Sequence, residues 1–117
     1  MQLTNGYLRL GPRFCSRERP VPVRAPELFL WNQTLADELG LGLDGERDRE
    51  RIAAWLGGNE TLFESEPVAL VYAGHQFGSF VPRLGDGRAH VLGDCVDRGG
   101  TRRDLQLKGS GPTLFAR

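Results

Sequence analysis

The spacing of apolar residues predicts two short helices, at 32–39 and at 46–56. Asn32 can cap the start of the first helix, and Gly40 can end it in a left-handed turn, because glycine has no Cβ to oppose that conformation. The second segment has one apolar and one charged side and is followed by two glycines, which is typical of an amphipathic helix and its end. Its apolar side consists of Ile52, Trp55 and Leu56.

Between about 80 and 108 the pattern predicts a small antiparallel sheet of three strands with a glycine-containing hairpin connection. Side chains alternate between the faces of a strand, so Leu105 and Leu107 share one face and Gln106 and Lys108 share the other. In the preceding strand, alternation places Ala89, Val91, Gly93 and Cys95 on one face and His90, Leu92, Asp94 and Val96 on the other. The expected core contributors, on the face against the helices, are Leu105, Leu107, Val91 and Ala89.

Two further stretches have less regular patterns. The apolar run 68–73 is too short for periodicity to separate a helix from a buried strand, and of the two we predict a helix. Residues 1–26 show no sustained period and contain several prolines and glycines, which predicts an arm that runs extended over a neighbouring element. Together the elements predict an α+β fold, with the arm and the helices at 1–66 and the sheet at 67–117.

Composition favours a protein without a nucleic-acid or membrane partner. Fifteen basic and fifteen acidic residues give a formal net charge of zero, so nothing indicates nucleic-acid binding. No apolar stretch approaches the roughly 20 residues that span a bilayer, and the first residues resemble neither a secretory signal nor a transit peptide, so we expect a cytoplasmic location. Sixteen glycines and seven prolines among 117 residues predict many loops and marginal stability for this chain alone.

Cys15 and Cys95 are the two cysteines, and they form neither a C-x-x-C pair nor a disulfide framework. We therefore expect reduced thiols, with Cys95 buried in its strand. The alternative for Cys95 is a redox-sensing thiol whose pKa is lowered by nearby positive charge. The residues that could supply that charge are Arg98, Arg102 and Arg103.

A glycine-flanked turn at 85–88 and Lys108 are the candidate chemistry of the chain. The glycines at 85 and 87 leave backbone N–H groups uncovered, and Arg88 adds a charged donor, so the turn suits an anion such as a phosphate. Lys108 ends the next strand but one and could neutralise the same anion. A Walker A loop is excluded because Lys108 precedes its glycine, and a dinucleotide-binding turn is disfavoured because a strand follows Gly87. An ordinary hairpin turn and a solvated lysine remain the alternatives.

Three motifs in order, YAGHQFG at 72–78, LGDGRA at 84–89 and LQLKGSGPT at 105–113, resemble the signature run of the selenoprotein O family. Segments upstream agree, and the resemblance covers nearly the whole chain. It implies a protein-kinase-like small lobe, with an antiparallel β-meander, at 67–117. It also implies a pseudokinase that acts as a protein adenylyltransferase and moves AMP from ATP to Ser, Thr or Tyr hydroxyls of proteins. Two departures are LFAR at 114–117, where the family usually has PYSR, and Asp94, where glutamate is usual.

By position, the resemblance implies that Gly85, Gly87 and Arg88 contact the nucleotide and that Lys108 neutralises its phosphates. Family members are several hundred residues long, so the catalytic residues and the ligands of a Mg or Mn ion are expected outside this chain. The alternative is a non-catalytic module that binds nucleotide weakly or only contacts another protein. We prefer a structural role for His75 over a phosphate or acid–base role, and we assign His90 no chemistry.

Overall fold

The computed structural model describes residues 3–76, 78–85 and 87–114, with the backbone alone described at 71–76 and 79–85. An α+β fold is confirmed. None of the helices in the described ranges is long and apolar enough to cross a membrane. In chain order the elements are α1 (Gly6–Leu10), β1 (Cys15–Arg17), α2 (Gln33–Leu39), α3 (Arg49–Leu56), β2 (Val68–Gln76), β3 (Ser79–Gly85), β4 (Ala89–Val96) and β5 (Arg102–Lys108).

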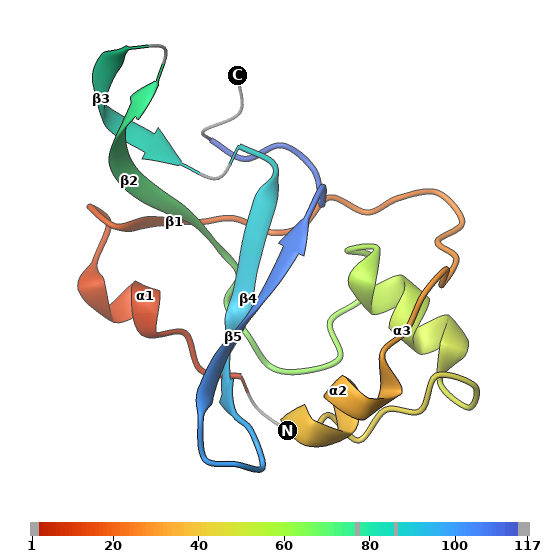
Figure 1. The fold of residues 1–117 in the computed structure, drawn as a ribbon. Coiled ribbons are helices and arrows are strands. Elements are labelled where there is room, and N and C mark those ends of the chain that lie inside the picture. The colour runs from red at the N-terminus through yellow and green to blue at the C-terminus, as the bar shows by residue number, and fades with distance from the viewer. Residues whose placement is uncertain (1–2, 77, 86, 115–117) are drawn as a thin grey trace.

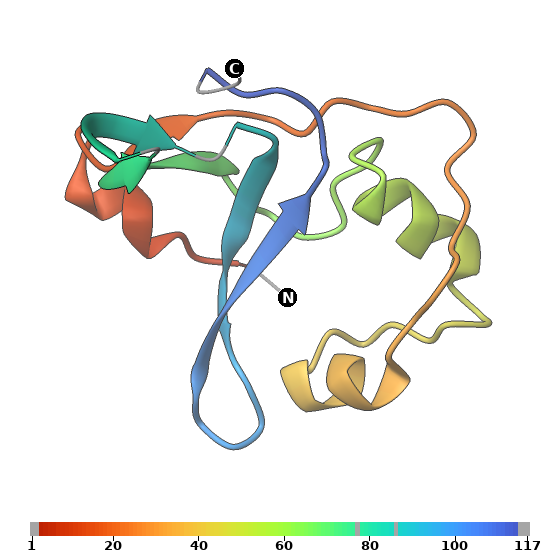
Figure 2. The ribbon, with the colours of Figure 1, turned by 45° about the horizontal axis from the view of Figure 1, so that its top comes forward.

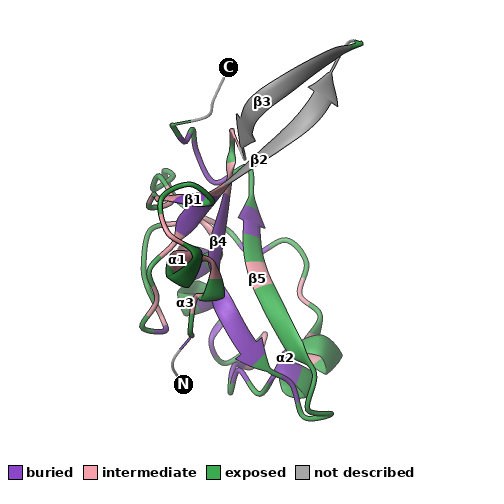
Figure 3. Ribbon diagram, turned by 90° about the vertical axis from the view of Figure 1, so that its left-hand side faces the viewer, coloured by how far each residue is buried: buried purple, intermediate pink, exposed green. Residues whose placement is uncertain are grey.

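A long β4–β5 hairpin runs through the middle of the molecule (Figure 1). Helices α2 and α3 lie on one side of this hairpin, and α1 lies on the other side with β1, β2 and β3 (Figures 1 and 2). The sheet is antiparallel throughout its described pairings, in the order β1-β2-β4-β5, and β3 pairs with β2. Strand β4 is buried along most of its length whereas β5 is mostly exposed, as Figure 3 shows. The hairpin therefore separates two apolar layers.

The prediction of a helix at 68–73 is wrong, because these residues form the first part of strand β2. Val68 and Ala69, whose side chains point to opposite faces of the strand, are both completely buried, so both faces of β2 are covered here, while β1 and β4 pair along its two edges. A strand that is covered on both faces carries an unbroken apolar run with no alternation. Such a run cannot be distinguished from a short buried helix by periodicity.

The predicted three-stranded meander is correct only for its second pair. Strands β4 and β5 form the expected hairpin, from Ala89 opposite Lys108 to Val96 opposite Arg102. Strand β3 instead folds back on β2, with Gly85 opposite Val71. Strands β3 and β4 both pair with β2 and, among the described pairings, not with each other, so their connection is a corner of the sheet and not the ordinary hairpin turn that was the alternative.

A β-bulge in β4 corrects the expected faces of this strand. Val91 pairs with Gln106 and Gly93 with Leu105, so Leu92 is an extra residue, and the alternation shifts after it. Leu92 shares the face of His90, which pairs with Leu107, and therefore lies in the core cluster that faces the helices, and the shift brings Cys95 into the same cluster. Val91 lies in the separate cluster with Cys15 and Val68, and Ala89 is only partly buried. On the helix side the correct members are Leu105, Leu107 and Cys95, together with the unexpected Leu92.

Both predicted helices are confirmed, with one later start. The Asn32 side-chain oxygen accepts a hydrogen bond from the Leu35 N–H at 2.9 Å, and Gly40 ends α2 with φ 70° and ψ 31°. Helix α3 begins at Arg49, later than expected, because the Asp44 carboxylate accepts hydrogen bonds from the Glu46 and Arg47 N–H groups and forms a separate turn. Leu56 was expected in the core but is 36% exposed.

The N-terminal arm is only partly extended, since it contains α1 and β1. After β1, residues 18–23 form an extended segment, here called the strap, which crosses from the sheet side to the helix side over the end of β5 (Figure 2). Its backbone is fixed at three points. Glu18 N–H donates to Pro67, Val21 N–H donates to Ser110, and the Asn59 side chain bonds both backbone groups of Val23.

The turn before α3 gives a prediction for acid stability. Hydrogen bonds from the Arg47 guanidinium and the Asp44 N–H lower the pKa of Asp48 from its ordinary value of 3.8 to about 2. As pH falls, the Asp48 carboxylate is protonated in the unfolded chain before it is protonated in the folded one. The contribution of Asp48 to the free energy of unfolding is therefore complete above about pH 4 and is lost as pH falls towards 2. Between those values we expect urea midpoints of Asp48→Asn to fall less steeply than those of the wild type. Equal slopes would contradict this assignment, and Glu27→Gln, which changes an exposed carboxylate, is the control.

Candidate functional site

The turn at 87–88 and the end of β5 are held together by backbone hydrogen bonds. Ala89 pairs with Lys108 across the β4–β5 ladder. Beyond Lys108, the Gly109 N–H donates to the Arg88 carbonyl at 2.7 Å, and the Thr113 N–H donates to the Gly87 carbonyl at 2.8 Å. The loop 109–113 therefore lies along the turn, and the structure brings together three of the four predicted site residues. The fourth, Gly85, is described as the last residue of β3.

Two cationic side chains stand at this end of the sheet. Arg88 and Lys108 are both exposed, and Leu107 between Lys108 and Gln106 is buried towards the helices, so the expected faces of β5 are confirmed. Among the described residues, neither cation forms an ion pair. Two uncompensated positive charges beside glycine-rich backbone can bind an anion with several oxygens, such as a polyphosphate.

The loop 109–113 is also anchored to strand β4, by a contact that could not be recognised from the sequence. His90 is completely buried, and its Nδ1 lies 2.6 Å from the Ser110 Oγ. The Ser110 hydroxyl is 3.2 Å from the Leu107 carbonyl, to which it donates. The surroundings of His90 therefore indicate a structural role. Gly109 and Gly111, on either side of Ser110, both have positive φ. The sequence alone does not reveal this backbone conformation.

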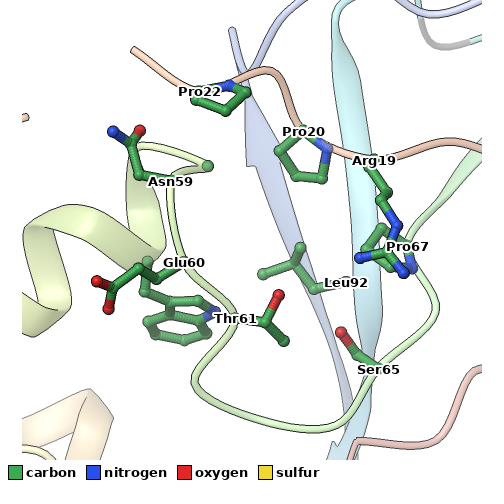
Figure 4. Close-up of a pocket in the computed structure, with 11 residues that line it drawn as sticks. Arg19, Pro20, Pro22, Asn59, Glu60, Thr61, Ser65, Pro67 and Leu92 are labelled. Carbon is green, nitrogen blue, oxygen red and sulfur yellow. The ribbon is translucent and has the colours of Figure 1, made fainter. Parts of the chain in front are cut away.

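A hollow of about 310 Å³ lies beside the strap (Figure 4). Arg19, Pro20 and Pro22 of the strap form one wall, and the segment after α3 forms the opposite wall. Leu92 of β4 lies between them. The strap thus borders this hollow and, through Val21, also contacts the loop at the candidate site.

Asp94, which departs from the glutamate that is usual in the resembling family, fixes the start of the chain to β4. Its carboxylate accepts hydrogen bonds from the Thr4 hydroxyl, the Gly6 N–H and the Arg102 guanidinium. Burial by itself raises the pKa of Asp94, but these three donors outweigh burial and hold the pKa below its usual value. Asp94 is therefore a charged structural residue at the opposite end of β4 from the turn.

Both cysteines are free and buried, as expected. Burial raises the pKa of the Cys15 thiol, and burial together with the nearby Asp94 and Asp97 carboxylates raises that of Cys95. A raised pKa leaves little thiolate at neutral pH, which weighs against the redox-sensing alternative for Cys95.

Other predicted chemistry finds less support or lies outside what is described. The side chain of His75 is outside the described residues. Within the described ranges, no group of three or more His, Cys, Asp or Glu side chains could hold a metal ion. We therefore assign no metal ligand to this chain.

Comparison with known proteins gives a consistent result. A family model described as "Protein adenylyltransferase SelO" matches residues 1–117. Proteins named "Protein nucleotidyltransferase YdiU" are similar to the chain: that of Rhizobium rhizogenes (strain K84) is 55% identical over 114 residues, 97% of this chain and 22% of that protein. The protein of Agrobacterium fabrum (strain C58) is 52% identical over 117 residues, 100% of this chain and 24% of that protein. The chain thus spans about a quarter of the length of the curated relatives it matches.

Proposed function

The chain belongs to the SelO family of protein adenylyltransferases, and we propose that it forms part of the ATP-binding small lobe of such an enzyme. Its family is one of nucleotidyltransferases. The observation that carries the proposal is the contact between the turn at 87–88 and the end of β5, where Arg88 lies one residue before Ala89, the ladder partner of Lys108, on glycine-rich backbone. Gly85, the last residue of β3, also belongs to the phosphate-binding turn in this proposal.

In this proposal the chain binds and neutralises the phosphates of ATP. Lys108 and Arg88 reduce the negative charge around the reacting phosphorus, which is the dominant form of stabilisation in phosphoryl-type transfer. A hydroxyl oxygen of a protein Ser, Thr or Tyr then bonds to the α-phosphorus of ATP, and the bond from that phosphorus to the α–β bridging oxygen breaks. Pyrophosphate leaves, and the hydroxyl proton passes to a base. We assign no base and no metal-dependent step to the residues of this chain.

A kinase-like small lobe and a cytoplasmic location belong to the same proposal. An antiparallel sheet whose corner and neighbouring strand end carry the phosphate-binding groups is consistent with the lobe. Two free buried thiols are typical of a reducing compartment.

ATP titration of the chain by calorimetry tests this function. Hydrogen bonds to charged groups contribute about 1.5–3 kcal/mol each, so Lys108→Gln and Arg88→Gln should each weaken ATP binding by roughly 10- to 100-fold. Both side chains are exposed, so the thermal unfolding of these variants should match that of the wild type. Arg98→Gln removes an exposed cation at the far end of the hairpin and should leave binding unchanged.

The non-catalytic module is the competing function. Absence of ATP-dependent heat in the folded wild-type chain would favour it. The transfer step itself is tested by a chimera in which this chain replaces the matching segment of the Agrobacterium fabrum relative, supplied with ATP labelled at the α-phosphate. The chimera should incorporate the α-phosphate label into protein. Lys108→Ala should abolish this incorporation while the chimera remains folded.

A further inference from the structure

We propose that Ser110, held by His90, is a positioning residue that fixes Lys108 and the loop 109–113 against the turn at 87–88. The inference rests on the proposed function of this site, and it assigns the task of pre-organisation to a pair of residues that do not touch the nucleotide. Groups that bind a ligand need supporting contacts that hold them in place before the ligand arrives. Without such contacts, ordering these groups costs free energy during binding and lowers the affinity.

The loop itself has little means of fixing its conformation. It reads Gly-Ser-Gly-Pro-Thr, and both glycines have positive φ, 74° at Gly109 and 105° at Gly111. Glycines lose more backbone freedom on ordering than other residues, so this loop needs strong external contacts. Pro112 is exposed, whereas Ser110 is 6% exposed. Ser110 is therefore the side chain through which the middle of the loop is tied to the protein interior.

The hydrogen bonds of Ser110 define how it is held. The Ser110 hydroxyl donates its one proton to the Leu107 carbonyl of strand β5, at an O···O distance of 3.2 Å. In the tautomer with the proton on Nδ1, His90 donates to the hydroxyl oxygen across the 2.6 Å contact. His90 is completely buried in β4, so the contact ties the loop to an inner strand of the sheet.

The strap holds the same residue from the outer side. The Val21 N–H donates to the Ser110 carbonyl at 2.8 Å. Ser110 is thus bonded through its side chain to β4 and through its backbone to the strap. Its neighbours Gly109 and Thr113 bond to Arg88 and Gly87. Lys108 directly precedes this fixed segment and is itself paired with Ala89, so the Ser110 contacts extend the support of its backbone beyond the end of β5.

Amide hydrogen exchange followed by NMR tests the bracing role directly. In Ser110→Ala, His90 Nδ1 loses its acceptor, and the Gly109 and Thr113 amides should exchange at least about tenfold faster than in the wild type. ATP affinity should fall several-fold at the same time. Ile52→Val is the control, because it weakens the helix-side core away from the loop and should not selectively expose these two amides.

Variants of His90 separate the hydrogen bond from packing. His90→Asn keeps an N–H near the Nδ1 position and should protect the two loop amides better than His90→Leu, which has no donor. Wild-type exchange of the Gly109 and Thr113 amides in Ser110→Ala would overturn the inference, and so would unchanged ATP affinity in a chain that binds ATP. If the wild type binds no ATP, the proposed function fails, while the exchange measurement still decides whether Ser110 braces the loop.

Discussion

Gly93→Ala is expected to destabilise the protein by about 2–4 kcal/mol, through overpacking and an unfavourable backbone conformation. Gly93 follows the extra residue of the β-bulge and has φ 153°. A Cβ at this position would lie 2.6 Å from the Thr4 carbonyl oxygen and 2.8 Å from the Leu3 Cβ. Neither atom is the end of a flexible side chain, so the start of the chain would have to leave β4. Chemical denaturation measures the loss.

Two matched variants identify its cause. Gly100→Ala also changes a glycine with positive φ, 84°, but its Cβ would meet nothing within 4 Å, so it should cost only about 1–2 kcal/mol. A chain that begins at Asn5 has no Thr4 carbonyl to displace. Gly93→Ala should therefore cost less in that shortened chain than in the whole one, a non-additivity expected of contacting groups. Equal costs in both chains would contradict the steric explanation.

Gly111→Ala is expected to cost a similar amount, about 2–4 kcal/mol, and to weaken ATP binding as well. Gly111 has φ 105°, and a Cβ there would lie 2.5 Å from both Cβ and Cγ2 of Val21. Relief of this overlap requires the strap to move away and the hydrogen bond from Val21 to Ser110 to break. The loop 109–113 would then lose its outer support. Denaturation and ATP titration of the same variant measure the two effects.

Val21→Gly provides the complementary test, because it removes both atoms that the new methyl group would overlap. Combined with Gly111→Ala, it should restore part of the stability lost by Gly111→Ala alone, and the remainder reflects the backbone strain. If the double variant is less stable than the sum of the two single effects predicts, the strap does not limit the space at Gly111.

Local signals were sufficient to predict the parts of the fold that a few neighbouring residues determine. The cap at Asn32 and the left-handed Gly40 lie at the ends of one short helix, and the structure shows both. The β4–β5 hairpin likewise joins segments that are close in sequence, so the pairing of its two strands and the core position of Leu107 could be predicted.

Features that depend on distant segments could not be predicted in this way. Val68 and Ala69 have an unbroken apolar pattern because both faces of β2 are buried there, and the strand β1 that pairs with them comes from the N-terminal arm. The bulge at Leu92 has the same origin, since the chain near Thr4 crosses β4 at Gly93 and Asp94. No spacing rule within β4 reveals such a crossing.

The candidate site divides along the same line. Gly87, Arg88 and Lys108 could be named from the sequence, because the hairpin brings the turn and the strand end together. Ser110 could not, because its support comes from His90, across the hairpin, and from Val21 in the strap. The groups proposed to bind the ligand belong to a sequence motif, whereas the contacts of Ser110 with His90 and Val21 have no such signal in the sequence.

The bond between Thr4 and Asp94 also has a consequence for synthesis in the cell. These residues are 90 positions apart, so during synthesis the segment around Thr4 waits for its partner until 90 further residues have been added. At roughly 5–20 residues per second, that interval is about 5 to 18 seconds. Leu3, which packs in the core on the helix side, is exposed during this time. The segment around Leu3 is therefore a natural binding segment for a chaperone that acts near the exit tunnel, and its docking on β4 must follow the synthesis of that strand.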